Sequence, residues 1–207
     1  MDKTAMYKLS YGLFVLTAKE GEKDNGCISN TVIQVTTEPN RIAVAVNKSN
    51  LTHNMILKTS RFTASILSEE ASFDTFKHFG FQSGRDVNKF ENLADIKRTV
   101  NGTLAVLKGT NAYITANVIS TMDLGTHTLF IADVVDGEVL SDVSSATYEY
   151  YQNHIKPKPE KTEKKEGGKK VWRCKVCGYV YEGEELPKDF TCPWCKHPAS
   201  DFELVEI

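Results

Sequence analysis

The sequence predicts a mainly β domain with peripheral helices, followed by a linker and a small C-terminal metal domain. Residues 1–155 hold seven segments rich in Val, Ile, Thr and aromatic residues, bounded by Gly, Asn or Asp, as strands are. Only three segments there favour helices. Because strands dominate, we expect a closed barrel. Residues 156–170 are nearly all charged or small, and four of the five cysteines lie in residues 171–207.

The elements of the first domain follow from local patterns. In the segment 42–47, every residue from Ile42 to Val46 is apolar, so both sets of alternating side chains are apolar. This predicts a strand that is buried on both faces. Ser49 and Asn50 are plausible N-caps for the first helix. The expected strands are 12–18, 31–37, 42–47, 62–67, 103–107, 112–121 and 128–135. The expected helices are 51–58, 72–79 and 146–155.

Residues 156–170 form the expected linker. They contain seven Lys against three Glu, and their only apolar residues are two prolines. Such a segment buries too little surface to offset its ordering entropy, so a flexible tether is expected, with a solvated helix as the alternative.

Charge and hydropathy exclude several classes of protein. A net charge of −2 argues against a general nucleic-acid binder. No run approaches the ~20 apolar residues of a membrane span, so no membrane partner is expected. The first residues do not resemble a signal peptide, so we expect a cytoplasmic protein.

The C-terminal cysteines predict a metal site. Cys174, Cys177, Cys192 and Cys195 are spaced Cys-x2-Cys-x14-Cys-x2-Cys, and each pair can place two thiolates on one ion. A domain this small needs a metal or cross-links, and disulfides are the alternative that a cytoplasmic chain disfavours. The spacing alone does not choose between zinc and iron.

The residues around these cysteines resemble a rubredoxin. They include Gly178 after Cys177, Pro193-Trp194 inside the second pair and a high share of aromatic residues. The short gap between the pairs is closer to the rubredoxin-like module of rubrerythrins. The resemblance implies one iron on four thiolates that carries one electron, and a structural zinc ribbon stays open.

Three polar loops are the candidate cofactor site of the first domain, which has neither a GxGxxG nor a P-loop motif. Asp24–Thr31 is either a hairpin turn at Asn25-Gly26 or a wall facing a flat heteroaromatic ring. Asn47–His53 opens a helix and suits a phosphate, unless Ser49 simply caps that helix. In Gly80–Phe90, Arg85 and Lys89 would share a face if helical, and otherwise lie in an exposed charged loop.

Together these loops resemble the flavin reductase family of FMN-binding split β-barrels, over about residues 1–152. The resemblance implies noncovalent FMN at the interface of a homodimer. By position, the isoalloxazine ring is bordered by Asn25, Cys27, Ile28, Ser29, Asn30 and Thr31. The phosphate loop supplies Asn47, Lys48, Ser49 and Thr52, supported by Arg85. Cys27 is expected to line the flavin without a covalent role.

His127 is expected on the nicotinamide side of the flavin, where it is the candidate catalytic residue. The alternative for His127 is a strand histidine with satisfied hydrogen bonds.

The order flavin domain, tether, rubredoxin-like domain resembles the high-molecular-weight rubredoxins of anaerobic bacteria. It implies an NAD(P)H-dependent oxidoreductase that passes hydride to FMN and single electrons to the four-cysteine iron. The expected acceptor is a flavodiiron protein that reduces dioxygen or nitric oxide. The alternatives are a flavin reductase that releases reduced flavin and carries a zinc ribbon for protein contacts, and a non-enzymatic flavin sensor.

Overall fold

The computed structural model describes residues 5, 8–157, 170–175, 179–193 and 198–206. The chain divides into two compact units, Met1–Lys156 and Pro157–Ile207, and each is described by itself. Most of the predicted linker, residues 158–169, lies outside the described residues, and its last residue, Lys170, begins a strand. Within the described ranges, no helix is both long and apolar enough to cross a lipid bilayer.

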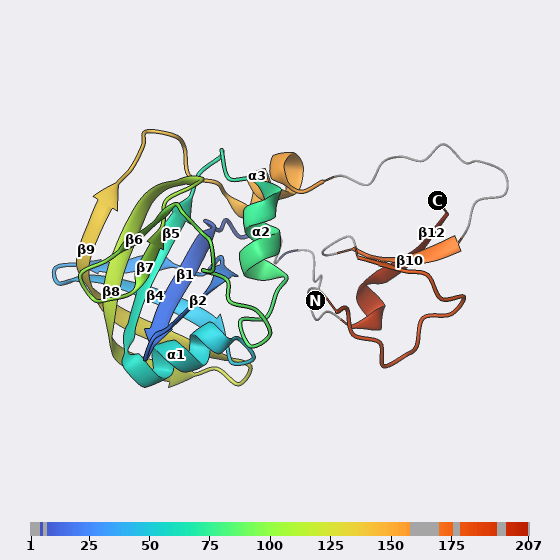
Figure 1. Cartoon of the computed structure of the whole chain (residues 1–207), viewed down its shortest axis with the longest axis horizontal. Coiled ribbons are helices and arrows are strands. Elements are labelled where there is room, and N and C mark those ends of the chain that lie inside the picture. The colour runs from blue at the N-terminus through green and yellow to red at the C-terminus, as the bar shows by residue number, and fades with distance from the viewer. Residues whose placement is uncertain (1–4, 6–7, 158–169, 176–178, 194–197, 207) are drawn as a thin grey trace. The chain divides into compact units, whose positions relative to one another are not determined.

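The first unit is built on a seven-stranded antiparallel sheet, which confirms the mainly β prediction. Its strand order is β2-β1-β5-β8-β9-β4-β3. The strands are β1 (Phe14–Glu20), β2 (Lys23–Ser29), β3 (Ile33–Thr37), β4 (Asn40–Asn47), β5 (Arg61–Leu67), β8 (Thr110–Asp123) and β9 (His127–Val139). A two-stranded sheet pairs β6 (Ile96–Arg98) with β7 (Leu104–Val106). Figure 1 shows the long strands curling around one another.

The two edges of the sheet meet where β2 leads into β3, and Thr31 lies in that connection. Its hydroxyl donates to the carbonyl of Ala45 at 2.8 Å and accepts from the Ala45 amide at 3.1 Å. β3 begins two residues later, with Ile33 opposite Ala43. The Thr31 side chain therefore takes the place of one strand pairing and ties the end of β2 to β4.

Two helices pack against the strands β1 and β2 of the sheet. α1 (Leu51–Thr59) packs against β1, and α2 (Phe73–Gly80) packs against β2. The predicted helix 146–155 consists of α3 (Tyr148–Tyr150) and a π-helical turn over Tyr151–Ile155. One apolar cluster fills the barrel, and a second lies between β1, α2 and Tyr151. As predicted, β4 is buried on both faces over most of residues 42–47.

β2 departs from the expected arrangement. The chain turns at Gly21, which has a φ of +57°, and Asn25 and Gly26 are paired within β2 opposite Ala18 and Thr17. The alternative of a hairpin turn at Asn25-Gly26 is therefore wrong, and the strand at Lys23–Ser29 is not among the expected ones. Gly26 is needed for close packing, because a Cβ there would lie 3.1 Å from both the Leu16 carbonyl oxygen and the Phe79 ring.

The second unit contains a three-stranded sheet of order β11-β10-β12. Its strands are β10 (Lys170–Cys174), β11 (Val180–Tyr181) and β12 (Phe202–Glu206), and a 3-10 turn spans Ala199–Asp201. Beside the sheet, the Phe190 ring lies 4.7 Å from the Tyr181 ring and 5.3 Å from the Phe202 ring, centroid to centroid.

Candidate functional site

Side chains from all three predicted loops meet at the start of α1. The Asn25 amide on β2 donates to the Thr52 hydroxyl at 2.8 Å. The Arg85 guanidinium donates to the Ser49 carbonyl, also at 2.8 Å. Gly84 lies directly against Asn25, because a Cβ on Gly84 would be 1.9 Å from Asn25 Oδ1. Segments that are far apart in the sequence therefore form one local structure.

The N-terminus of α1 is suited to an anion. Asn50 occupies the N-cap position, and its side chain makes no capping hydrogen bond. Ser49, the alternative cap, lies one residue before the N-cap position, and its amide donates to the side-chain oxygen of Asn47 at 2.9 Å. Free N–H groups and the helix dipole point at this end, as in other phosphate sites.

Lys48 lies beside this helix end, where it pairs with a carboxylate. Its ammonium is 2.6 Å from Asp123 Oδ1. This contact, and then a hydrogen bond from the Gly125 amide, lowers the pKa of Asp123. A phosphate bound at α1 would have to compete with Asp123 for Lys48.

Thr52 is buried, and its hydroxyl faces the protein interior. Besides the bond from Asn25, it contacts the thiol of Cys27. Burial raises the pKa of Cys27, and the Thr52 contact and the Lys89 charge lower it by less. Cys27 is thus a protonated, buried thiol at neutral pH, which suits a lining role and not that of a nucleophile.

The rest of the first loop lies half-buried where β2 ends. The Ser29 and Thr31 hydroxyls are 3.2 Å apart, and both are engaged within the loop or with β4. Ile28 packs toward Gly80 at the end of α2. Asn30, which lies between Ser29 and Thr31 in the chain, is half-buried. Backbone groups and the Asn30 side chain are therefore the part of this loop best placed to meet a ring.

His127 begins β9 and lies directly opposite Asn47 in the β4–β9 pairing. Its Nδ1 is 2.9 Å from the Thr126 hydroxyl, and the residue is half-buried. The Lys48 amide donates to the Thr126 carbonyl at 3.0 Å. The fold thus brings His127 next to the predicted phosphate loop.

His53 is a neighbour of this site that no sequence pattern singles out. It is buried, its Nε2 is 2.8 Å from the Thr128 hydroxyl, and its ring packs edge-on against Phe130. His53 therefore fixes the first turn of α1 to β9. A lone histidine after Thr52 gives no sequence signal for this role.

The position of Lys89 fits neither a helical face shared with Arg85 nor an exposed charged loop. Arg85 is exposed, whereas Lys89 is buried and points inward, so they do not share a face. The Lys89 ammonium donates to the carbonyls of Gly26 and Phe79, each at 2.9 Å.

The metal site is described in part. Cys174 ends β10 and Cys192 follows Thr191, and both are buried. Cys177 and Cys195 lie outside the described residues. The Cys174 amide donates to the Tyr179 carbonyl at 2.8 Å. Two buried thiols beside a cluster of aromatic rings fit a thiolate-bound metal ion.

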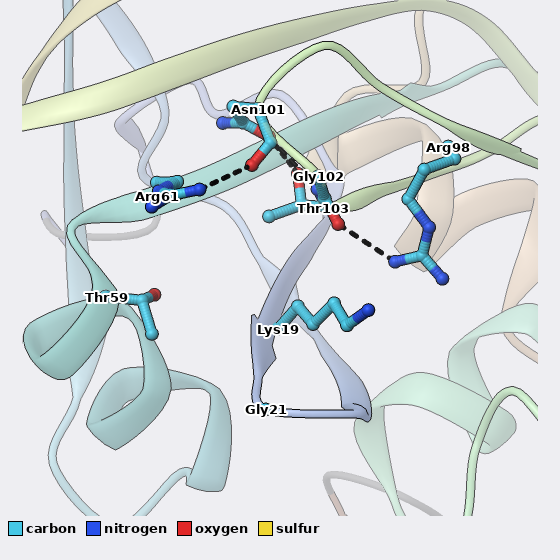
Figure 2. A pocket seen from close by; sticks show the side chains of 8 residues that line it. All are labelled: Lys19, Gly21, Thr59, Arg61, Arg98, Asn101, Gly102 and Thr103. Carbon is cyan, nitrogen blue, oxygen red and sulfur yellow. Dashed lines mark hydrogen bonds between the residues drawn. The ribbon is translucent and has the colours of Figure 1, made fainter.

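A cavity of about 540 Å³ is lined by other residues. None of the eight residues drawn in Figure 2 belongs to the candidate flavin loops. Its cations are Lys19, Arg61 and Arg98. Figure 2 shows Arg61 bonded to the Asn101 carbonyl and Arg98 to that of Gly102. Arg98 also holds both oxygens of Asp24, so much of the positive charge is already neutralised.

Comparison with known proteins matches both units. The profile of the flavin reductase like domain matches residues 6–158, and that of the rubrerythrin, rubredoxin-like domain matches residues 172–203. A high molecular weight rubredoxin of Moorella thermoacetica is 36% identical over 99% of this chain and 100% of its own length. A ferric-chelate reductase (NAD(P)H) of Archaeoglobus fulgidus is 38% identical over 78% of this chain and 95% of its own.

A solved structure of a putative flavin reductase from Haemophilus somnus has the same fold. Its TM-score is 0.63 at 19% identity, over 70% of this chain and 91% of that one. The sequence profile covers most of the first unit, and the similarity to the Moorella protein runs through both. The chain therefore belongs to the flavin reductase-like family, with the domain composition of a high-molecular-weight rubredoxin.

Proposed function

We propose that this protein is an NAD(P)H-dependent electron-transfer flavoprotein with a bound FMN and a four-cysteine iron. The observation that carries the proposal is the meeting of three loops at the uncapped N-terminus of α1, through the Asn25–Thr52 and Arg85–Ser49 bonds. FMN would supply the acceptance of a hydride and the release of its two electrons one at a time.

The residues of the chain bind and orient the flavin. The free N–H groups of α1, with Lys48, Ser49 and Arg85, hold the phosphate. Asn47 and the buried Thr52 shape this loop, Thr52 through its bond to Asn25. The loop from Asn25 through Cys27, Ile28, Ser29 and Asn30 to Thr31 borders the ring. His127, opposite Asn47, lies on the side where the nicotinamide of NADH or NADPH binds.

The C-terminal domain carries electrons away from the flavin. Four thiolates from Cys174, Cys177, Cys192 and Cys195 hold an iron that changes by one electron. Buried cysteines and nearby aromatic rings limit the access of water and so tune the potential. Thiolate ligands need reduced cysteines, which agrees with a cytoplasmic location.

A redox partner protein, which we take to be a flavodiiron oxygen or nitric oxide reductase, receives these electrons. Residues 171–207 contain seven acidic against four basic residues. We therefore expect a weak, salt-sensitive contact with a basic surface on the acceptor.

A homodimer completes the proposal. All five residues of β3 are exposed, and a cavity of about 520 Å³ is lined by apolar residues of β3, β4, β8 and β9. Ile33 is 60% exposed and Val139 76% exposed beside it. Exposed apolar residues gathered around a groove are typical of protein interfaces.

An anaerobic titration of the purified protein with NADH and with NADPH tests this function. We expect flavin absorption to bleach and an iron–thiolate visible spectrum to bleach with it, at catalytic rates. A colourless C-terminal domain that contains zinc, with reduced flavin released to solution, would instead support a flavin reductase. Bound flavin that neither nicotinamide reduces would support a sensor.

A further inference from the structure

A buried ammonium group lies within the wall of the proposed flavin site. Lys89 is 3% exposed, and its side chain reaches from the loop after α2 back to β2. Its ammonium donates to two backbone carbonyls: that of Gly26, between Asn25 and Cys27, and that of Phe79, near the end of α2. Lys89 therefore lies directly behind the segment that we assign to the ring of the flavin.

No carboxylate pairs with this ammonium among the residues that the structure describes. The thiol of Cys27 interacts electrostatically with this ammonium, and burial keeps that thiol protonated, while the His78 ring contacts the Lys89 carbonyl oxygen at 2.6 Å. Burying an unpaired cation is costly, because two neutral carbonyls replace only part of its hydration. Burial accordingly lowers the pKa of Lys89 to about 8, which leaves it mostly charged at pH 7.

The unfavourable free energy of burying the ammonium is offset when an anion binds close to it. Besides the two hydrogen bonds that join β2 to α2, Lys89 supplies a positive charge, and a positive charge in a low-dielectric wall stabilises negative charge strongly. Under the proposed function, the flavin ring lies against loop 25–31, on the other side of this wall.

We propose that Lys89 is the fixed positive charge that stabilises the reduced, anionic form of the flavin ring. This inference rests on the proposed function. A hydride from the nicotinamide brings two electrons and one proton to the neutral ring, so the reduced ring carries one negative charge, and the nicotinamide leaves as its oxidised cation. Lys89 acts on the ring electrostatically, across β2, and does not contact the hydride. It is therefore a positioning residue and not a catalytic one.

The test compares the affinities of oxidised and reduced FMN in three variants of the full-length protein. Lys89→Met removes the charge, Lys89→Arg keeps it, and Lys108→Met removes a matched charge from an exposed position outside the loops. We expect the preference for reduced over oxidised FMN to fall about tenfold in Lys89→Met. It should stay near the wild-type value in Lys89→Arg and Lys108→Met. Binding is measured anaerobically by titration, so turnover is not needed.

The outcomes separate this inference from the proposed function. An unchanged preference in a folded Lys89→Met protein would show that Lys89 only clamps β2 to α2. If Lys89→Met and Lys89→Gln both fail to fold while Lys89→Arg folds, the charge serves the fold and the proposal is also overturned. A wild-type protein that binds neither form of FMN contradicts the flavin assignment itself.

Discussion

The side-chain amide of Asn25 donates a 2.8 Å hydrogen bond to the hydroxyl of Thr52, and so joins β2 to the first turn of α1. Both side chains are buried, and the hydrogen bond fixes the orientation of the Asn25 amide. Gly84 closes over this pair from the third loop. The geometry of the candidate flavin site therefore depends on the close contact between Gly84 and Asn25, where a side chain at position 84 would not fit.

Gly84→Ala should weaken FMN binding at least tenfold and lower the melting temperature. Its Cβ would lie 1.9 Å from Asn25 Oδ1, and the Asn25 side chain cannot move without losing Thr52. Overpacking of this kind costs roughly 1–3 kcal/mol. Quenching of FMN fluorescence and thermal unfolding measure the two effects.

A double-mutant cycle provides the control for Gly84. In an Asn25→Ala background, Gly84→Ala should cost much less, because the clashing oxygen is gone. Equal costs in both backgrounds would show that the loops do not meet as described.

Asp123→Asn should strengthen FMN binding a few-fold, and Lys48→Gln should weaken it. Asp123 holds the ammonium of Lys48 and places a negative charge near the proposed phosphate site. Exposed ion pairs contribute modestly, so small factors are expected. Riboflavin, which lacks the phosphate, is the matched ligand: its affinity should not respond to either substitution. Equal changes for FMN and riboflavin would place the phosphate elsewhere.

The flavin-free protein should gain stability between about pH 8 and pH 10.5 through Lys89. Its folded pKa is about 8, below the 10.5 of an unperturbed lysine, so in this range the unfolded chain binds a proton that the folded protein has released. The full gain is about 3 kcal/mol at 1.36 kcal/mol per pKa unit. Urea unfolding at several pH values measures it.

Lys89→Met is the control for this pH dependence. The variant should lose the rise in stability, while Lys108→Met keeps it. A wild-type stability that falls steadily from pH 8 upward, as in Lys89→Met, would contradict a buried ammonium.

Cys192→Ser should abolish the iron–thiolate absorption and electron delivery to the acceptor protein, while NADH still reduces the bound FMN. Cys192 is buried in the C-terminal unit, and a serine hydroxyl is a poor ligand for iron. Visible spectra and iron content per chain measure the effect. Cys27→Ser is the matched variant, because it removes the cysteine of the first unit and should keep the iron. Loss of FMN from Cys192→Ser would mean that the two domains depend on each other.

Ile33→Glu combined with Val139→Glu should convert the proposed dimer to a monomer. Both residues are exposed beside the apolar groove of β3, β8 and β9, and buried carboxylates oppose association. Light scattering after size exclusion reports the mass. Ile119→Glu, another exposed apolar residue that is not among the groove residues, serves as the control. A wild-type protein that is already monomeric would remove the premise.

The sequence predicted the strands that have a strong apolar pattern, such as residues 42–47, and placed the first helix within one residue of its end. It did not predict the strand β2, because Asn25-Gly26 has the composition of a hairpin turn. Gly26 is instead required by the approach of Phe79 and Leu16. A contact of this kind involves residues distant in sequence, and local turn preferences cannot reveal it.

The candidate site was predicted as three loops, and the fold joins them by contacts that no local pattern encodes. Lys89 is the clearest case. A lysine in a polar loop is ordinarily expected to be exposed to solvent. Lys89 is buried because its ammonium donates to the carbonyls of Gly26 and Phe79, which the local sequence does not reveal. His53 likewise depends on Thr128, which is distant in sequence.

The Thr31 hydroxyl, bonded to both the amide and the carbonyl of Ala45, gives this corner of the barrel a side-chain lock where strands elsewhere use backbone pairing. Because a rotatable side chain and not a neighbouring strand protects the Ala45 amide, that amide can exchange with solvent deuterium through a local rotation, without separation of β4 from β9. Its exchange rate would thus report on movements of the candidate loop 25–31 while the barrel stays folded.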